Sequence, residues 1–247
     1  MQYYRGAIGV ACLVGGMVQA TSTSGHGSSM RGAAARIASE RTESDLSLYG
    51  GDNMWNAADW ETVDDRVRGG KSESHLTVLE DGGAAIFHGF LDIETLGGAG
   101  FASQRTTPLP AGKSFDLSKY DGLGIRILRG DGKKYALNIK NNELTKRPDG
   151  RVESSIEYKA VFTTTDGSDG MYYFPFSTFQ AYYRGKISND APPLENKSIT
   201  SFSIMMQSYF GEQKGEFELV IASISAMTDK WVMENSESGV IVEQNKL

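Results

Sequence analysis

The sequence predicts an all-β protein, a sandwich of two sheets with jelly-roll-like connections. Short runs rich in β-branched and aromatic residues alternate with turns rich in Gly, Pro, Asn and Asp. Glycine accounts for 29 of the 247 residues and shows no collagen period, which suits the many tight turns and bulges of a β fold. The sequence shows no sustained helical period and no internal repeat.

Nine strands are expected between residues 75 and 225. They are His75–Leu79, Ala84–Phe90, Gly100–Arg105, Leu123–Leu128, Lys134–Lys140, Ser155–Phe162, Met171–Phe176, Ser201–Gln207 and Glu216–Ser225. The turn Arg129–Gly132 lies between two strong strands and predicts a hairpin. Either Asn56 or Asp59 is expected to cap a short helix before Trp60.

Four of these strands alternate apolar and polar residues. Because side chains of a strand point to opposite sides with a period of two, each of the four has an apolar and a polar side. The apolar sides carry Leu123, Ile125 and Ile127; Tyr135, Leu137 and Ile139; Ile156, Tyr158, Ala160 and Phe162; and Phe202, Ile204 and Met206. The opposite sides carry Arg126, Ala136, Asn138, Lys140, Ser155, Glu157, Lys159, Ser203, Met205 and Gln207. We expect the apolar sides to pack between two sheets. Glu216–Ser225 is apolar on both sides, which indicates a central strand.

Three stretches of different character divide the chain. We expect a targeting leader or disordered segment at 1–46, the sandwich domain at 47–228 and a C-terminal tail at 229–247. Arg5, an apolar run and the small residues ending at Ala20 are typical of a secretory signal peptide cleaved after Ala20. The Ser-, Ala- and Gly-rich stretch 21–39, with two Arg and no acid, instead suits an organelle transit peptide. The secretory pathway, mitochondria and plastids therefore stay open, and no transmembrane segment is expected in the mature chain.

Composition excludes several classes of function. The net charge is −6, and an acidic body argues against nucleic acid as a partner. Cys12 is the only cysteine, so the chain can form neither an internal disulfide nor a cysteine-based metal site. The histidines are scattered, and no metal or cofactor site is predicted.

No catalytic residues are predicted either. Metalloprotease, phosphate-loop and nucleophile-elbow patterns do not occur. Asp64 and Asp65 are adjacent, and neighbouring residues of a strand point to opposite sides, so they do not form a glycosidase pair. We expect them to be solvated acids in a turn.

Two segments, 60–72 and 97–105, set charges beside paired glycines, where a backbone can approach a partner closely. We expect their charged and aromatic residues to form one partner-binding patch at an end or edge of the sandwich. The candidates are Trp60, Asp65, Arg66, Arg68 and Arg105. In the alternative interpretation the glycines form bulges, and the Arg and Asp side chains only tie the loops together.

The same segments carry a resemblance to a known family. The motifs are Trp60, Asp64-Asp65, Gly69-Gly70-Lys71-Ser72, Phe87-His88-Gly89, Gly97-Gly98, Phe101-Ala102-Ser103-Gln104-Arg105, Asp116-Leu117-Ser118-Lys119-Tyr120-Asp121-Gly122-Leu123, Gly130-Asp131-Gly132-Lys133-Lys134-Tyr135 and Phe202-Ser203-Ile204-Met205-Met206. In this order, over about 48–227, they resemble the complex I intermediate-associated protein 30 family, its short fungal-type members above all. The resemblance implies a galactose-binding-like β-sandwich and a mitochondrial, non-enzymatic chaperone for respiratory complex I assembly. It implies no catalytic residues and no cofactor.

Two functions of different class remain. The resemblance implies protein clients, namely complex I assembly intermediates. A secreted or endomembrane carbohydrate-binding module is the alternative, favoured by the signal-like leader and by the glycosylation sequon Asn196-Lys197-Ser198. Sugar sites usually offer exposed aromatic platforms, and the polar side listed above contains none, which disfavours this alternative.

Overall fold

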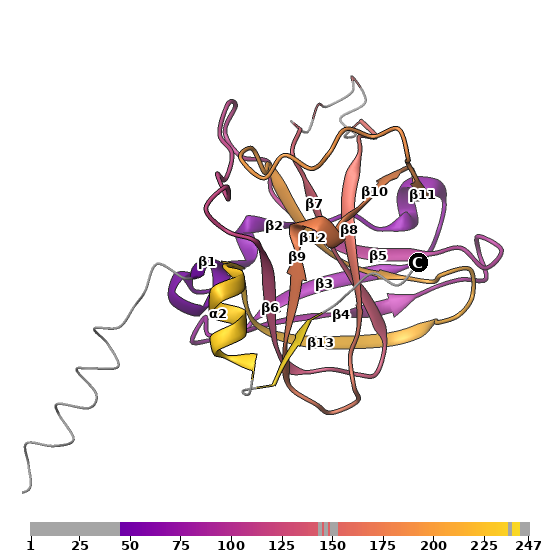
Figure 1. Ribbon diagram of the computed structural model, residues 1–247. Coiled ribbons are helices and arrows are strands. Elements are labelled where there is room, and N and C mark those ends of the chain that lie inside the picture. The colour runs from indigo at the N-terminus through magenta and orange to yellow at the C-terminus, as the bar shows by residue number, and fades with distance from the viewer. Residues whose placement is uncertain (1–44, 143–144, 146–147, 149–152, 237–238, 243–247) are drawn as a thin grey trace, which may run out of the picture. The chain divides into compact units, whose positions relative to one another are not determined.

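The computed structural model describes residues 45–142, 145, 148, 153–236 and 239–242. These residues form two seven-stranded sheets that pack face to face as a β-sandwich (Figure 1). Apart from its last two residues, the leader expected at 1–46 lies outside the described residues.

The first sheet has the order β14-β9-β6-β13-β4-β3, with β1 pairing to β13 as well. Its strands are β1 (Asp45–Gly50), β3 (Glu73–Val78), β4 (Ala85–Leu91), β6 (Gly122–Arg129), β9 (Gly170–Pro175), β13 (Gly215–Met227) and β14 (Val240–Val242). The strand β13 pairs with β6 on one side and with β4 and then β1 on the other. It is therefore the central strand that its two apolar sides predicted.

The second sheet has the order β11-β10-β8-β7-β12-β5-β2. Its strands are β2 (Trp60–Thr62), β5 (Phe101–Thr106), β7 (Lys134–Lys140), β8 (Glu157–Thr163), β10 (Gln180–Tyr183), β11 (Lys186–Ile187) and β12 (Ser201–Gln207). All the predicted strands are present, while β1, β2, β10, β11 and β14 were missed. Three of these have only two or three residues, too few for an alternation to be recognised.

Short helices complete the described chain. They are the 3-10 helices η1 (Gly51–Asn53), η2 (Ala57–Asp59), η3 (Asp65–Arg68) and η4 (Phe176–Thr178), and the α-helix α2 (Asp229–Glu234). Asn56 caps η2 as expected, since its side chain accepts a hydrogen bond from the backbone N–H of Ala58 at 3.1 Å. After residue 228, where a tail was expected, Val232 of α2 packs on Tyr173 and β14 pairs with β9.

The turn between β6 and β7 corrects one prediction. The two strands belong to different sheets, so Arg129–Gly132 is a crossover and not a hairpin. Gly130 forms a bridge with Asp166, and a Cβ on Gly130 would lie 2.5 Å from the Cβ of Thr164. The glycine lets the crossover pass close against that neighbouring segment. By contrast, the turn after β3 does join a hairpin, because β3 and β4 pair.

The core lies between the two sheets, on the sides that alternation assigned to it. Every residue of the predicted apolar sides is at most 2% exposed, except the partly buried Ile156. Aromatic rings connect the layers, with Phe87 of the first sheet 6.2 Å from Tyr135 of the second and Phe162 of the second 5.1 Å from Tyr172 of the first. Such pairs add about 0.5–1.5 kcal/mol beyond their buried area.

A charge placed in this core tests the assignment. Ile125 is fully buried on β6, so Ile125→Asp is expected to lower the free energy of unfolding by about 4 kcal/mol or more. Leu128→Asp on the same strand is the control, because Leu128 is 44% exposed. Urea denaturation measures both variants. Equal stabilities for the two would contradict the inward orientation of Ile125.

Candidate partner-binding site

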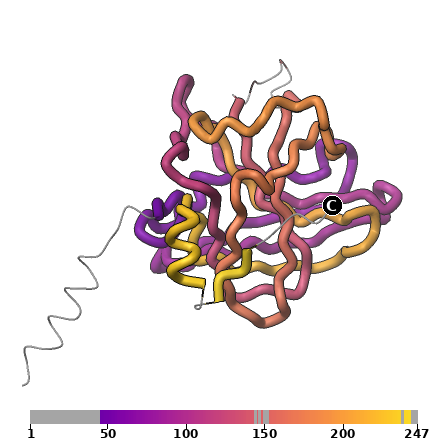
Figure 2. Tube along the Cα trace, in the orientation of Figure 1, coloured from indigo at the N-terminus to yellow at the C-terminus, as the bar shows by residue number. Residues whose placement is uncertain are grey.

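Three loops that carry the chain from one sheet to the other lie against each other (Figure 2). They are the loops 64–72 between β2 and β3, 92–100 between β4 and β5, and 208–214 between β12 and β13. The backbone N–H of Asp92 donates to Ser72 Oγ at 3.1 Å, and the N–H of Ser208 donates to the carbonyl of Gly100 at 3.0 Å. We call this assembly the three-loop cluster.

Asp65 ties the first loop to the start of β5, directly after the second loop. Its carboxylate is fully buried. Oδ1 accepts a hydrogen bond from the N–H of Ser72 at 3.0 Å, and Oδ2 accepts from Ser72 Oγ at 2.7 Å and from the N–H of Phe101 at 3.2 Å. A Cβ on Gly70 would lie 2.2 Å from Asp65 Oδ1. The glycine next to Lys71 thus makes room for a carboxylate of the same loop.

Asp64 works in the same way on different strands. Its Oδ1 accepts from Ser74 Oγ at 2.6 Å and from the N–H of Ser103 at 2.8 Å, and its Oδ2 accepts from the N–H of Ser74 at 2.9 Å. Burial raises the pKa of the Asp64 carboxyl, while these hydrogen bonds lower it. The expectation of solvated acids is wrong, because both carboxylates are buried and each accepts three hydrogen bonds.

The two arginines of the first loop lie at the surface. Arg66 pairs with Glu73 in an ion pair whose side chains are 58% and 54% exposed. The guanidinium of Arg68 stands 5.5 Å from the ring centre of Phe101. Held in place by the buried Asp65, these side chains can meet a partner.

The other two candidates lie elsewhere, which corrects the expectation of a single patch. Trp60 is 6% exposed and packs in the core, with its ring 5.0 Å from Tyr49 and 5.7 Å from Trp55. Arg105 lies on the outer side of the second sheet, where it pairs with Glu61 and its side chain is 12% exposed. Asp65 is in the cluster but buried, so of the five candidates only Arg66 and Arg68 face solvent there.

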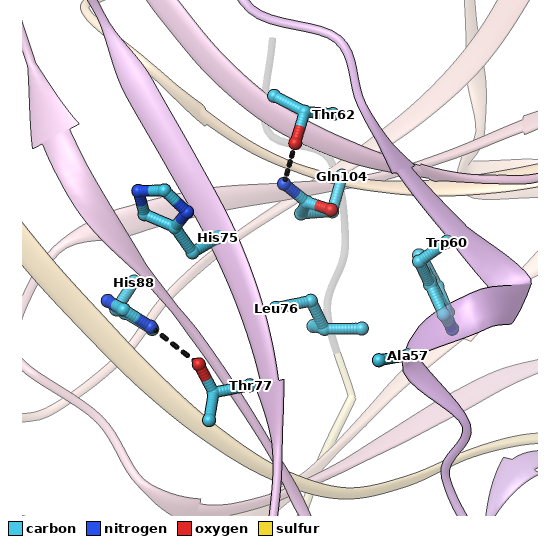
Figure 3. Close-up of a pocket in the computed structure, with 8 residues that line it drawn as sticks. All are labelled: Ala57, Trp60, Thr62, His75, Leu76, Thr77, His88 and Gln104. Atoms are coloured by element: carbon cyan, nitrogen blue, oxygen red, sulfur yellow. Dashed lines mark hydrogen bonds between the residues drawn. The ribbon is translucent and has the colours of Figure 1, made fainter.

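A pocket of about 500 Å³ opens between the edge strands β2 and β3 (Figure 3). Its lining is Ala57, Trp60, Thr62, His75, Leu76, Thr77, His88 and Gln104. Figure 3 shows its two hydrogen bonds, from Gln104 Nε2 to Thr62 Oγ1 at 2.9 Å and between His88 Nε2 and Thr77 Oγ1 at 2.9 Å. Within the described residues, no group of three or more His, Cys, Asp or Glu side chains could hold a metal ion.

The outer side of the second sheet carries a row of polar residues in direct register across five strands. The row is Arg105, Ser203, Asn138, Lys159 and Gln180. Lys159 is 3% exposed, donates to Gln207 Oε1 at 2.8 Å and stands 4.6 Å from the ring centre of Tyr182. Burial lowers the pKa of Lys159. The polar side is therefore largely buried, and Tyr182 gives it an aromatic residue that the sequence analysis did not place there.

Comparison with known proteins decides the family. The family model of complex I intermediate-associated protein 30 matches residues 49–221. This chain belongs to that family. A Schizosaccharomyces pombe protein described as uncharacterized (C9E9.15) is 40% identical over 186 residues, which cover 74% of this chain and 84% of the relative. Some of the motifs that carried the resemblance lie in the three-loop cluster, namely Asp64-Asp65, Gly69 to Ser72 and Gly97-Gly98, whereas others lie on strands and in loops elsewhere in the sandwich.

One solved structure supports the sandwich fold of this family member. A family 11 carbohydrate-binding module of Clostridium thermocellum, in complex with a β-1,3-1,4-mixed-linked tetrasaccharide, has a TM-score of 0.50 at 17% identity and covers 76% of this chain and 97% of that chain. A second family 11 module, from the cellulase Lic26A-Cel5E of the same organism, has a TM-score of 0.48 at 16% identity. The first likeness shows the jelly-roll β-sandwich and nothing about the ligand. In the described part of the chain, no helix is long and apolar enough to cross a membrane.

Removing one buried acceptor tests whether the hydrogen bonds to Asp65 stabilise the fold. Asp65→Asn keeps the shape, but in either orientation its amide N–H₂ faces one of the two backbone N–H groups that donate to Asp65 in the wild type, that of Ser72 or that of Phe101. We expect a loss of about 1–3 kcal/mol of unfolding free energy, the cost of an unsatisfied buried group. Glu73→Gln removes an exposed carboxylate of the same loop region and is expected to cost under about 1 kcal/mol. Denaturant titration compares the two variants. Equal losses of unfolding free energy would contradict a stabilising role of the hydrogen bonds to Asp65.

Proposed function

We propose that this family member is a non-enzymatic assembly factor that binds protein intermediates of respiratory complex I in mitochondria. The observation that carries this proposal is the family match, which spans residues 49–221 and hence most of both sheets. We propose the three-loop cluster as the binding surface, with Arg66 and Arg68 in contact with the client.

Physical chemistry supports that surface. Loops on a rigid β scaffold commonly carry binding residues, and Arg is favoured at interfaces because its planar fork pairs with carboxylates and stacks on rings. The six hydrogen bonds accepted by Asp64 and Asp65 fix the loop backbone before a client arrives. Preorganisation of this kind lowers the entropic cost of association.

Carbohydrate binding is the second candidate, because Tyr182 lies on the outer side of a sheet in a sandwich of carbohydrate-binding-module type. A sugar platform needs a free aromatic face, and the ammonium of Lys159 stands over this ring at 4.6 Å. Electrophoresis in gels containing β-1,3-1,4-mixed-linked glucan separates the candidates. We expect the protein to migrate as it does without the glucan. Retardation by the glucan would favour carbohydrate binding.

The proposed function also implies a cell compartment, the mitochondrion. An assembly factor for complex I acts in mitochondria, whereas the leader also suits the secretory pathway or plastids. Cell fractionation together with the N-terminal sequence of the mature protein tests it. Mature protein in the mitochondrial fraction is the expected result, and glycosylated Asn196 would point to the secretory pathway instead.

Loss of the two surface arginines tests the binding surface. The double variant Arg66→Ala with Arg68→Ala is expected to fold and melt like the wild type, because both side chains are exposed. Its apparent affinity for complex I intermediates should fall about tenfold or more, as expected where arginines are energetic hot spots of an interface. Co-purification followed by native gel electrophoresis measures the recovered intermediates.

A matched control removes two arginines from another surface. Arg126→Ala with Arg129→Ala breaks exposed ion pairs to Asp169 and Glu218 on the first sheet. This variant should keep its partners. If both double variants fold and retain every partner, the three-loop cluster is the wrong surface.

A further inference from the structure

The third loop of the cluster carries an exposed aromatic ring that takes no part in the core. Phe210 is 89% exposed, more than any other large apolar side chain among the described residues. Its neighbours leave it uncovered, because Gly211 follows it and Gly98 of the adjacent loop lies beside its carbonyl. The sequence analysis did not single it out, and the signal it offered was two aromatics in a turn, Tyr209 and Phe210, directly before a glycine.

The backbone that presents Phe210 is strained. Tyr209, Phe210 and Gly211 have φ values of 46°, 58° and 97°, so three successive residues lie in the left-handed region. Residues other than glycine rarely adopt this region, and it persists only where surrounding contacts impose it. Strain of this kind is concentrated at functional sites.

Contacts on both sides of the tip impose the conformation. The side chain of Gln213 accepts a hydrogen bond from the N–H of Lys134 at 3.0 Å and donates to the carbonyls of Lys134 at 2.7 Å and Gln207 at 2.6 Å. The ammonium of Lys134 stands 4.7 Å from the ring centre of Tyr209. Tyr209 is thereby held against the sheet, and Phe210 is directed away from it into solvent.

The charges around Phe210 fit a protein surface better than a lipid surface. Lys214 pairs with Glu94 at 3.9 Å, and Lys134 pairs with Glu212 at 3.0 Å. Glu94 and Glu212 are 84% and 64% exposed, so an anionic bilayer would repel them, whereas surfaces that bind anionic bilayers are enriched in Lys and Arg. An apolar centre with a polar rim of both signs is the anatomy of a protein interface.

We propose that Phe210 is the anchor of the three-loop cluster: its ring inserts into an apolar pocket on a protein client, and Arg68 and the Lys214–Glu94 pair form the polar rim. This inference rests on the proposed protein-binding function and names its central contact. Aromatic anchors that fill a partner's pocket dominate the energetics of interfaces, and a ring held rigidly beforehand loses little freedom on docking.

Substitutions at position 210 separate binding from folding. In the full chain purified from its own cells, Phe210→Ser is expected to lower the apparent affinity for complex I intermediates about tenfold or more with an unchanged melting temperature. Phe210→Gly should lose binding while melting at or above the wild-type temperature, because glycine tolerates the left-handed conformation. Phe210→Tyr keeps the ring and should keep binding. Met233→Ser, at a site 74% exposed on α2, is the matched control and should change neither.

A photo-crosslinking residue at 210 identifies what the ring touches, with the same residue at 233 as the control. Crosslinks from 210 to one complex I subunit, absent from 233, support the anchor. Retention of intermediates by Phe210→Ser, while the Arg66 and Arg68 double variant loses them, overturns the anchor but leaves the proposed function standing. A wild-type chain that recovers no intermediates overturns the proposed function itself. Flotation of the wild type, but not of Phe210→Ser, with anionic vesicles would replace the protein client by a membrane.

Discussion

Burial of two adjacent carboxylates is the constraint on which the three-loop cluster depends. An ionised carboxylate is costly to bury unless its oxygens are hydrogen-bonded, and Asp64 and Asp65 meet this condition with donors from four different residues. Asp64 bonds to Ser74 and Ser103, on a strand of each sheet, while Asp65 bonds to Ser72 and Phe101. The pair therefore joins the two sheets at the point where the chain crosses between them.

This constraint explains a family motif without reference to a partner. Position 70 is a glycine because a side chain there would collide with the carboxylate of Asp65. Ser72 supplies two of the three hydrogen bonds that Asp65 accepts. The parts of the motif that looked most like a binding site are thus structural. The proposed client surface is therefore limited to exposed side chains that these hydrogen bonds do not use, above all Arg66, Arg68 and Phe210.

Period-two alternation made the inner sides of the sheets predictable, because burial of one side of a strand leaves a pattern in the sequence itself. The crossover at Gly130 was not predictable, since the same turn residues serve a hairpin and a passage between sheets. Burial of Asp65 and exposure of Phe210 reverse the usual preferences of these residue types. Both depend in part on neighbours distant in sequence, Phe101 in one case and Lys134 in the other, so the local pattern alone did not place either side chain.

The same fold also shows why chemistry must be read from side chains and not from architecture. On the outer side of the second sheet, Lys159 donates to the amide oxygen of Gln207 and lies over the face of Tyr182, so this ammonium and this ring are already in contact with each other. In the same row Asn138 Oδ1 and Arg105 Nε are buried without a hydrogen-bond partner among the described residues. The three-loop cluster differs. There Gln213 and Tyr209 hold the backbone in a strained conformation that places the ring of Phe210 in solvent. Exposure of the Phe210 ring does not stabilise the folded chain, and the backbone that exposes it is strained. We therefore infer that the ring completes a contact with a second protein.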